Sequence, residues 1–516
     1  MPLQDYLIKS AQEFPDKEAL IQAGSRTTYR EILHGASAMA RWLLSENLRH
    51  GDRVAILTDN PAEYVMAYFG ILMAGGVAVP LNTQTSAGTL QYLFNHCGIS
   101  FLFTQTNYLK YLNALRDALP TLKAVAMSGR IGEASWNLPC TYTSLDVIIA
   151  SPDNTLPHGG TARTSDSDLA QITYTSGTTG QPKGVMLRHA NLMANTASII
   201  QYLHLNEDER HMVVLPFFYS FGNSILLSHF AVHASMVVHQ SLVYPNVVLD
   251  LMMREKATGF SGVPSTYAIL LNRSALSSYS FPHLRYCTQA GGAMSPKLAQ
   301  MLKALLPHVS IYIMYVQTEA CARLSYLEPQ ELLRKAGSIG KAIPNVTLDV
   351  LNQDGRPVKP GEVGEIVARG NNIMAGYWED PEATKMVLKK EGLWTGDLAR
   401  MDEEGYLYIV SRKSDMIKSG AHRIAPKEIE DSILEHEAVH EVAVLGVDDE
   451  ILGEAIRACI VLKEGKACNK KEIQAHCHKK LPVYKVPHQV IFCEQLPKTS
   501  SGKIKKNELK GAIPVQ

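Results

Sequence analysis

Residues 173–189 read TYTSGTTGQPKGVMLRH, and this segment is the most informative part of the chain. Hydroxyl side chains alternate with glycines, so backbone N–H groups and hydroxyl donors can surround phosphate oxygens, while Lys183 adds a positive charge. It is not a Walker loop, because G-x-x-x-x-G-K-[ST] is absent, and the chain has no G-x-G for a dinucleotide fingerprint. We therefore predict a triphosphate cradle from Thr175 to Gly184, with a Ser/Gly-rich surface turn as the alternative. The predicted phosphate-binding residues are Thr175, Ser176, Gly177, Thr178, Thr179, Gly180 and Lys183.

Short β-branched runs alternate with helical patterns on both sides of this segment. A helical pattern from Pro61 to Met73 lies between the runs RVAIL (53–57) and GVAVPL (76–81). The same rhythm recurs between residues 211 and 315, at HMVVLPF, ASMVVH, LRYCTQA and SIYIMY. This alternation predicts βαβ units, mostly parallel sheets and an α/β fold for the body of the chain.

Length and composition are those of a folded protein with more than one domain. The chain has 516 residues, whereas a single domain averages about 150. Apolar residues make up 46% and charged residues 19%, which is typical of globular rather than disordered chains. The N-terminus lacks the apolar region of a signal peptide, and no apolar stretch approaches the roughly 20 residues that span a bilayer. We expect no transmembrane segment.

The charge balance and the cysteines restrict the partners and the compartment. Fifty Lys and Arg residues balance fifty Asp and Glu residues, so no global field attracts nucleic acid. The eight cysteines form no C-x-x-C and no regular framework, which suits free thiols in a reducing cytosol. We predict a cytoplasmic enzyme that does not bind nucleic acid.

Further motifs follow in the order that is found in one enzyme superfamily. They are QAGGAM (289–294), YVQTE (315–319), TGD (395–397), SRKSDMIKSGAHRIAP (411–426) and PKTSSGKI (497–504). Over almost its whole length the chain resembles the acyl-adenylate-forming, AMP-binding superfamily, and acyl-CoA synthetases and acyl-carrier-protein ligases most of all. The resemblance implies an α/β fold: a large N-terminal domain of mixed and parallel sheets flanked by helices, and a small mobile α+β C-terminal domain.

The nucleotide site follows from this resemblance position by position. Tyr315 would pack against the adenine, and the two oxygens of Asp397 would accept the ribose hydroxyls. Gly291 and Gly292 would let the ligands approach the backbone closely. Beside the phosphate segment, the implied ATP- and AMP-binding residues are Gly291, Gly292, Ala293, Tyr315, Thr318, Asp397 and Arg412.

The resemblance also implies the catalytic residues. Lys503 would bridge the attacking carboxylate and the α-phosphate, and Thr318 would lie near that phosphate. Glu319 and Thr178 would hold Mg²⁺ through hard oxygen ligands. Catalysis of such a transfer consists mainly of alignment and of neutralising the charge that builds on phosphate oxygens. For Lys503 the alternative is an ordinary solvated Lys-rich tail.

Two domains joined by a hinge are expected. The prediction places the large adenylation domain at residues 1–411, the hinge at 412–414 and the small domain at 415–516, with Ser414 as the pivot. Relatives commonly have a charged residue at that pivot. After rotation, Gly420 and Ala421 would line the channel for a phosphopantetheine arm, although glycine is usual at the position of Ala421.

The acyl pocket is expected at Tyr219, Gly292 and Val316. Tyr219 occupies the place of a gating His or aromatic residue, and Val316 replaces the usual glycine, so its added bulk would shorten the pocket. Amino-acid-activating relatives carry an Asp near LPFFYSFGNS (215–224), and none is present here. An unpaired ammonium is costly to desolvate, which favours a fatty or other simple carboxylic acid.

One zinc-like motif competes with this assignment. Residues 436–440 read HEAVH, which on a helix would present two zinc ligands and a general base. The strand pattern EVAVLGV begins at once after it, so we expect the helix to end near His436 and the two histidines to diverge. We predict no zinc site.

We therefore predict an AMP-forming acid–thiol ligase. It would activate a carboxylic acid with ATP and Mg²⁺, release pyrophosphate, and transfer the acyl group to CoA or to the phosphopantetheine of an acyl or peptidyl carrier protein. One alternative is an amino-acid-activating ligase that loads a carrier protein. An inactive nucleotide-binding module is another.

Overall fold

The computed structural model describes residues 2–22, 24–130, 136–151, 164–175, 181–420, 422–450, 452–498 and 504–510. The helices are α1 (Gln4–Glu13), α2 (Tyr29–Ser45), α3 (Pro61–Met73), α4 (Ala87–Cys97), α5 (Leu109–Ala114), α6 (Leu145–Ile149), α7 (His189–Leu203), α8 (Ser220–Phe230), α9 (Pro245–Arg254), α10 (Pro264–Arg273), α11 (Pro296–Leu305), α12 (Pro381–Val387), α13 (Pro426–Leu434), α14 (Lys470–His478) and α15 (Lys506–Lys510).

An eight-stranded sheet has the order β19-β9-β8-β4-β3-β5-β6-β7. Its strands are β3 (Arg53–Leu57), β4 (Val77–Pro80), β5 (Ile99–Gln105), β6 (Ala124–Ser128), β7 (Thr141–Ser144), β8 (Leu169–Thr175), β9 (Lys183–Arg188) and β19 (Gly376–Tyr377). The strands from β8 to β7 run parallel, while β9 and β19 join in antiparallel fashion. Thr175 at the end of β8 and Lys183 at the start of β9, the described ends of the predicted phosphate segment, are paired at this edge of the sheet.

A nine-stranded sheet has the order β16-β15-β14-β13-β12-β10-β11-β1-β2. Its strands are β1 (Glu18–Gln22), β2 (Ser25–Thr28), β10 (Arg210–Val213), β11 (Ser235–Val238), β12 (Gly259–Gly262), β13 (Tyr286–Gln289), β14 (Ser310–Gln317), β15 (Ala322–Leu327) and β16 (Lys341–Ala342). Its centre, from β14 to β1, is parallel. The carboxyl ends of β12, β13 and β14 therefore meet at one edge, which is where ligands bind in open α/β sheets.

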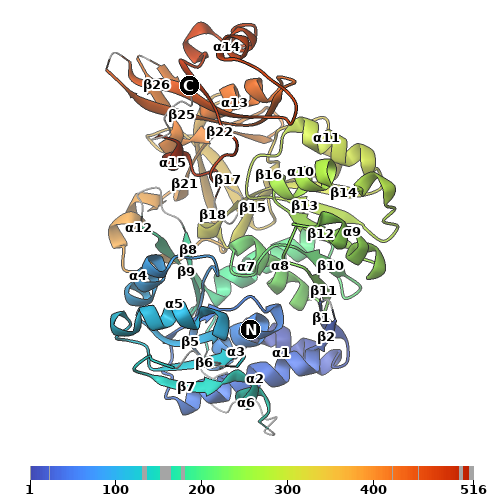
Figure 1. The fold of residues 1–516 in the computed structure, drawn as a ribbon, viewed down its shortest axis with the longest axis vertical. Coiled ribbons are helices and arrows are strands. Elements are labelled where there is room, and N and C mark those ends of the chain that lie inside the picture. Colours follow the sequence, from blue (N-terminus) through green and yellow to red (C-terminus); the bar gives the residue numbers. More distant parts are fainter. Residues whose placement is uncertain are drawn as a thin grey trace.

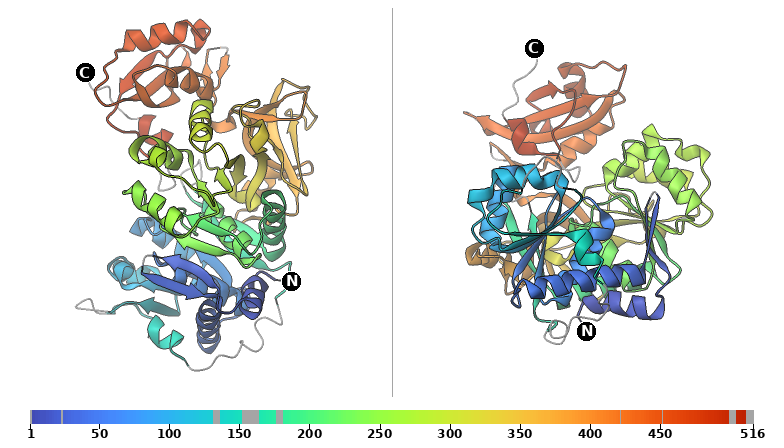
Figure 2. Two further views of the ribbon diagram at one scale, coloured as in Figure 1. Left: turned by 90° about the vertical axis from the view of Figure 1, so that its right-hand side faces the viewer. Right: turned by 60° about the horizontal axis from the view of Figure 1, so that its bottom comes forward.

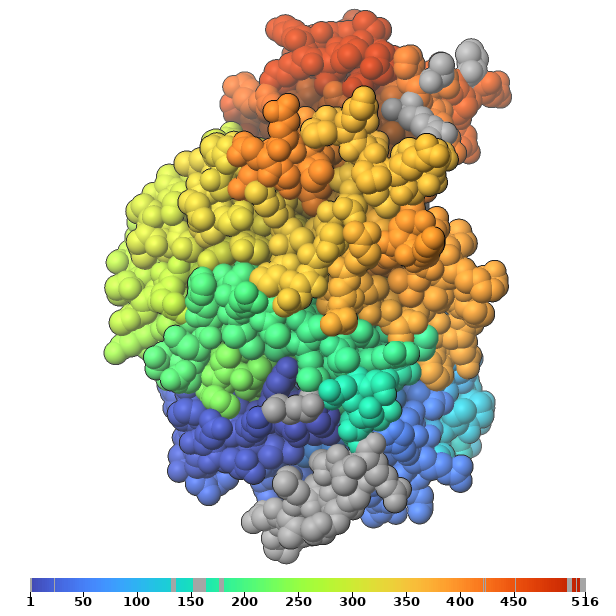
Figure 3. Space-filling view, turned by 180° about the vertical axis from the view of Figure 1, so that it is seen from behind, coloured from blue at the N-terminus to red at the C-terminus, as the bar shows by residue number. Residues whose placement is uncertain are grey.

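Two further sheets are built from the C-terminal third of the chain. The first holds β17 (Val346–Leu351), β18 (Val363–Gly370), β20 (Leu388–Lys389), β21 (Gly392–Met401) and β22 (Leu407–Arg412), all antiparallel. The second holds β23 (Ile417–Ser419), β24 (His422–Ile424), β25 (Val439–Asp449), β26 (Gly453–Leu462) and β27 (Gln489–Phe492). Figure 3 shows this last part, in red, at the end of the molecule opposite the N-terminal part in blue.

Local sequence explains where α3 begins. Asn60 caps the helix by accepting hydrogen bonds from the backbone N–H groups of Ala62 and Glu63, and Pro61 occupies the first turn. Proline fits there because its missing N–H would have no partner within the helix. The helix covers Pro61–Met73, as the apolar pattern predicts, and nearly all of its side chains are buried.

The main core lies between the two large sheets. Its buried residues come from strands of both sheets and from α1, α2, α3, α7 and α8. Figure 1 and the right-hand view of Figure 2 show the two sheets side by side with helices covering them. Separate clusters fill the outer faces and the C-terminal sheet. The predicted α/β fold, with a large part of mixed and parallel sheets and a small C-terminal part, is confirmed.

The HEAVH segment does not form one helix. The helix α13 ends at Leu434, and β25 begins at Val439, so His440 lies on an exposed strand position. The ring of His436 packs instead against His476, with 5.2 Å between ring centroids. Within the described ranges, no three His, Cys, Asp or Glu side chains are grouped so that they could hold a metal ion.

The helices of the described residues differ from membrane-spanning helices, which need about 20 mainly apolar residues. None of them is both long enough and apolar enough to cross a membrane.

Candidate functional site

The two ends of the phosphate segment face each other. Thr175 is the last residue of β8, and Lys183 is the first of β9, and the two are paired across the hairpin. The Lys183 ammonium lies 5.1 Å from the ring centroid of Tyr377, which belongs to β19 beside β9. The five predicted phosphate ligands between them, Ser176 to Gly180, lie outside the described residues.

Thr318 and Glu319 lie in the turn that joins β14 to β15. The Tyr377 hydroxyl donates to Oε1 of Glu319 over 2.8 Å, and the backbone N–H of Met374 donates to the Glu319 carbonyl over 2.9 Å. The hydroxyls of Thr318 and Ser220 are 3.2 Å apart, so α8 begins beside the turn. The turn is thus fixed from both large sheets, and Tyr377 stands between Glu319 and Lys183.

The backbone leaving this turn is strained. Cys321 and Ala322 have φ values of 61° and 126°, which non-glycine residues rarely adopt. Such strain persists only where the surrounding structure enforces it, and it is often found at functional sites. Asn372 contributes to that enforcement, because its amide donates to the Ala320 carbonyl over 3.1 Å.

Glu319 is suited to a hard divalent cation. One of its oxygens accepts the Tyr377 hydroxyl, and the other makes no hydrogen bond to any residue that the structure describes. Burial and the Glu319 carboxylate raise the pKa of Tyr377 far above its ordinary value, so this tyrosine stays a donor. The carboxylate is thereby oriented while one oxygen remains available, as Mg²⁺ coordination requires.

Asp397 forms the centre of the predicted ribose site. It lies on β21 and is 4% exposed. The Tyr315 hydroxyl donates to its Oδ2 over 2.5 Å, and Nε of Arg412 lies 3.1 Å from its Oδ1. Burial and the Asp397 charge raise the pKa of Tyr315 well above its ordinary value. Because an ionised carboxylate has about four acceptor positions, two remain for ribose hydroxyls.

The predicted glycines follow β13 at the edge where β14 also ends. Gly291 has a φ of +83°, which an L side chain would adopt only with strain. The carbonyl of Gly292 accepts from the Gln289 amide over 2.8 Å, and both Gly292 and Ala293 are exposed. This bare backbone therefore lies beside the Tyr315–Glu319 segment.

The predicted acyl-pocket residues come from three elements. Tyr219 immediately precedes α8, and its hydroxyl accepts from the Asn82 amide over 3.3 Å. Val316 lies on β14 with extended backbone, where the pairing with β15 is irregular between Tyr315 and Val316. The valine is thus accommodated in a strand, as its β-branched side chain requires.

The predicted hinge and channel residues lie beyond β22. Ser414 is exposed and donates to Asp415 over 2.9 Å, while Lys413 pairs with Glu365 over 2.9 Å. Gly420 has a φ of +57°, and its N–H donates to the Leu452 carbonyl over 2.7 Å. Ala421 and Lys503 lie outside the described residues.

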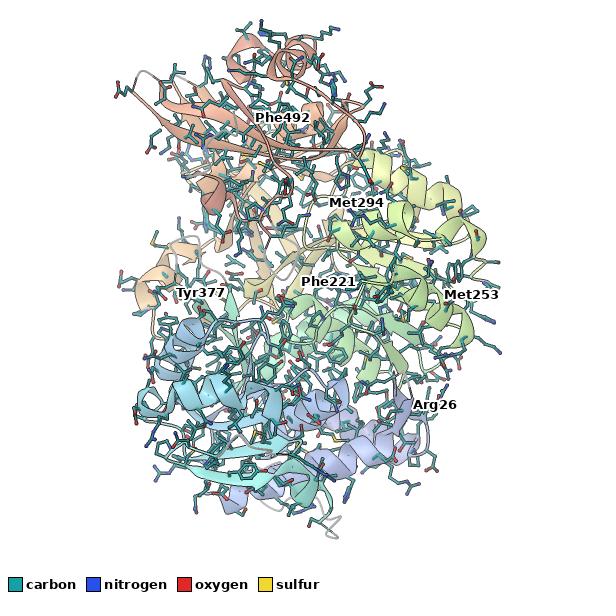
Figure 4. All side chains as sticks on the ribbon, in the orientation of Figure 1. Arg26, Phe221, Met253, Met294, Tyr377 and Phe492 are labelled. Carbon is teal, nitrogen blue, oxygen red and sulfur yellow. The ribbon has the colours of Figure 1, made fainter. Side chains whose placement is uncertain are left out.

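The sequence interpretation missed two side chains of this site. One is Tyr377, which orients Glu319, and the other is Glu365, which accepts the Gly396 N–H over 3.0 Å and also pairs with Lys413. Figure 4 shows Tyr377 and Phe221 at a similar height along the long axis, below the C-terminal sheet that carries Phe492. Only the aromatic pair in AGYW hinted at Tyr377, and no local signal marked Glu365.

Comparison with known families and proteins agrees with this geometry. The family described as AMP-binding enzyme matches residues 7–378, and the AMP-binding enzyme C-terminal domain matches residues 428–503. The chain is 30% identical to a long-chain-fatty-acid–CoA ligase of Bacillus subtilis over 98% of this chain and 94% of the relative. It is 31% identical to a mitochondrial medium-chain acyl-CoA ligase of Rattus norvegicus, over 97% and 86%.

A solved structure is similar over the whole chain. It is the o-succinylbenzoate CoA synthetase of Bacillus subtilis in complex with ATP and a magnesium ion. The TM-score is 0.85 and the identity 28%, with 99% of each chain covered.

Proposed function

The chain belongs to the AMP-binding enzyme family, and we propose that the residues gathered at the edge of its nine-stranded sheet carry out two half-reactions. It is an AMP-forming acid–CoA ligase of the acyl-CoA synthetase kind. ATP and Mg²⁺ are its cofactors, and CoA is its acyl acceptor. The observation that carries the site assignment is the convergence of Asp397, Tyr315 and Glu319 at the end of β14.

The first half-reaction forms the acyl-adenylate. A carboxylate oxygen of the acid attacks the α-phosphorus of ATP, the bond to the β-phosphate oxygen breaks, and pyrophosphate leaves. Asp397 and Tyr315 hold the ribose and adenine, while Glu319 and Thr178 hold Mg²⁺, which neutralises phosphate charge when bound. Lys503 aligns the attacking carboxylate with the α-phosphate.

The second half-reaction transfers the acyl group to a thiol. The thiolate sulfur attacks the acyl carbon, a thioester forms, and AMP leaves. We propose that the small domain, residues 415–516, turns about Ser414 so that Lys503 leaves and Gly420 and Ala421 face the adenylate. Gly420 supports this channel, because glycine carries no side chain that would block a pantetheine arm, and its φ of +57° disfavours any other residue there.

The acid that we propose is a fatty or other simple carboxylic acid rather than an α-amino acid. Residues 215–230, which run from β10 through α8, contain no Asp or Glu. A substrate ammonium would therefore lose its hydration beside Tyr219 without an ion pair from this segment.

We also propose a reducing compartment such as the cytoplasm, and a carrier-protein phosphopantetheine as the alternative thiol to CoA. All eight cysteines are described, and all are free thiols. Lys505 pairs with Glu508 over 2.8 Å, and Lys506 pairs with Glu430 over 2.7 Å. Each ammonium would have to leave its ion pair before it could bind an acidic partner. The relative from Rattus norvegicus is mitochondrial.

Carboxylate-dependent exchange of pyrophosphate into ATP tests the proposal. Lys503→Ala should lower the rate by about 10²–10³, the cost of losing a preorganised charge at the transferring group. Lys505→Ala is the matched control, because its exposed ion pair with Glu508 contributes little. Equal exchange rates in wild type and Lys503→Ala would refute the role of this lysine.

A further inference from the structure

Arg323 is a fully buried cation that the two half-reactions do not use. It lies on β15, is 1% exposed, and is the largest fully buried side chain in the described part of the protein. Its backbone is held by Asn195, whose amide donates to the Arg323 carbonyl over 2.8 Å. The backbone from which the guanidinium projects is thus fixed by α7.

The guanidinium has almost no polar partners. Nη1 donates to the Tyr202 hydroxyl over 2.7 Å, Nε has no hydrogen-bond acceptor, and no described carboxylate forms an ion pair with it. Two aromatic rings lie close to it: its central carbon is 5.5 Å from the ring centroid of Phe221 and 6.0 Å from that of Tyr202. Of its five potential donors, one has an acceptor among the residues that the structure describes.

The titratable groups nearby do not neutralise this charge. Burial, with the Arg323 charge adding to it, lowers the pKa of His211 well below its ordinary value and that of His229 to about 4. Both imidazoles are neutral and contact the Tyr286 hydroxyl, at 3.1 and 3.2 Å. An unpaired buried charge is strongly unfavourable, so the arrangement calls for an anion that the protein itself does not supply.

Arg323 faces the side of the sheet on which the acyl pocket is predicted. It is directly paired with Val316 across β14 and β15, and directly paired residues of antiparallel strands project from the same face. Val316 lies two residues before Thr318, or about 7 Å along the strand. Phe221, which lies under the guanidinium, follows Ser220, whose hydroxyl touches Thr318.

We propose that Arg323 binds a second carboxylate at the far end of the acid, so that the preferred substrate is a dicarboxylic acid activated at one end. This inference rests on the proposed function and narrows its substrate class. The planar guanidinium can form two parallel hydrogen bonds with one carboxylate. The terminal methyl group of a monocarboxylic acid can form neither of them. A purely structural role, in which Arg323 only joins α7 to β15 through Tyr202, is the alternative.

Wild-type enzyme and matched acids provide the first test. Pyrophosphate release is measured with adipate, its monomethyl ester and hexanoate, and then with succinate, glutarate and suberate to find the preferred length. The preferred diacid should exceed both its monomethyl ester and the monocarboxylate of the same length by on the order of 100-fold in kcat/KM, because the distal end of those analogues is uncharged and leaves Arg323 unpaired. Equal or higher values for the monocarboxylates at every length would overturn the proposal.

Two variants separate substrate binding from a structural role. Arg323→Met combined with Tyr202→Phe replaces both hydrogen-bonding partners by apolar side chains of similar size, which spares the fold more than a single change does. The double variant should lose about 100-fold with the diacid and retain or gain activity with the monocarboxylate. Tyr202→Phe alone, which keeps the cation, should preserve the diacid preference.

The remaining outcomes are also decisive. Equal losses for diacid and monocarboxylate in the double variant, with ATP binding intact, would assign Arg323 a structural role only. Activation of monocarboxylates alone by the wild type would refute this inference and leave the proposed ligase function standing. Absence of pyrophosphate release with any acid would refute both.

Discussion

The predicted ribose side and the predicted acyl side of the site differ in whether their buried charged residue has a partner of opposite charge. Asp397 is 4% exposed, yet its carboxylate already has a cation in Arg412 and a donor in Tyr315. Arg323 is as deeply buried and has one neutral hydroxyl partner. The charge on the proposed ribose side is therefore paired within the protein, whereas on the proposed acyl side we expect the charge of Arg323 to be paired only when the acid supplies a carboxylate.

Removing the Asp397 carboxylate from the ribose side should have the largest effect on activity. Asp397→Ala deletes the acceptor for both ribose hydroxyls and leaves the Tyr315 hydroxyl without its partner. Since each hydrogen bond to a charged group contributes about 1.5–3 kcal/mol, kcat/KM for ATP should fall by at least about 100-fold.

A deoxyribonucleotide makes that measurement specific. 3′-Deoxy-ATP should be a much poorer substrate than ATP for the wild type and no poorer than ATP for Asp397→Ala, which a double-mutant cycle reports directly. Asp349→Ala is the control, because Asp349 forms only an exposed ion pair with Arg369. An undiminished preference for ATP in the variant would show that Asp397 does not hold the ribose.

The magnesium side should show an intermediate effect. Glu319→Gln keeps the shape and removes the charge, so the Mg²⁺ concentration for half-maximal exchange should rise by about tenfold or more. Tyr377→Phe, which removes only the donor to Glu319, should cost about 1 kcal/mol, or roughly fivefold.

The pH dependence checks the second of these variants. The pKa of Tyr377 is raised, so its hydroxyl stays protonated throughout the assay range of about pH 6–9. The ratio of wild-type to Tyr377→Phe activity should therefore be constant over that range. A ratio that falls toward pH 9 would mean that Tyr377 loses its proton and is no longer the donor.

Two adjacent glycines should give the smallest effects on turnover, and their substitution separates backbone strain from added bulk. Gly291→Ala places a Cβ 3.1 Å from Val263 at a φ of +83°, so it should lower the free energy of unfolding by about 1–2 kcal/mol. Gly292→Ala lies outside the left-handed region, 3.3 Å from Pro264, and should change stability less while raising the KM for the acid. Thermal unfolding and acid titrations measure the two quantities, and equal melting temperatures would contradict the strain argument.

Much of the fold could be predicted because the capping residues and the apolar patterns in the sequence agree with the helices and strands of the folded protein. The pattern from Pro61 to Met73 is capped by Asn60 and followed by a glycine pair, and the helix has these bounds. The junction at HEAVH was also predictable, since alternation in EVAVLGV is incompatible with a continuing helix. These features depend on neighbours in the sequence.

The site could be predicted only where motifs carry it. Asp397, Tyr315 and Glu319 were expected from TGD and YVQTE, and the structure brings the first two into contact, although their roles remain predictions. No sequence motif marks Arg323, which follows the YVQTE segment by four residues. Its importance comes from burial without an anion and from its pairing with Val316, and both depend on tertiary structure.

The pairing of Asp397 with Arg412 has a consequence for control. The two residues face each other across β21 and β22, and Arg412 is the last residue before the segment that contains Ser414. On the proposed assignment of the ribose to Asp397, the nucleotide contacts the residue that is paired with Arg412, next to the predicted pivot. By thermodynamic reciprocity, whichever orientation of the small domain tightens ATP binding is also the one that ATP stabilises. Two fluorophores, one before and one after β22 in the chain, would then report nucleotide binding as a change in the distance between them.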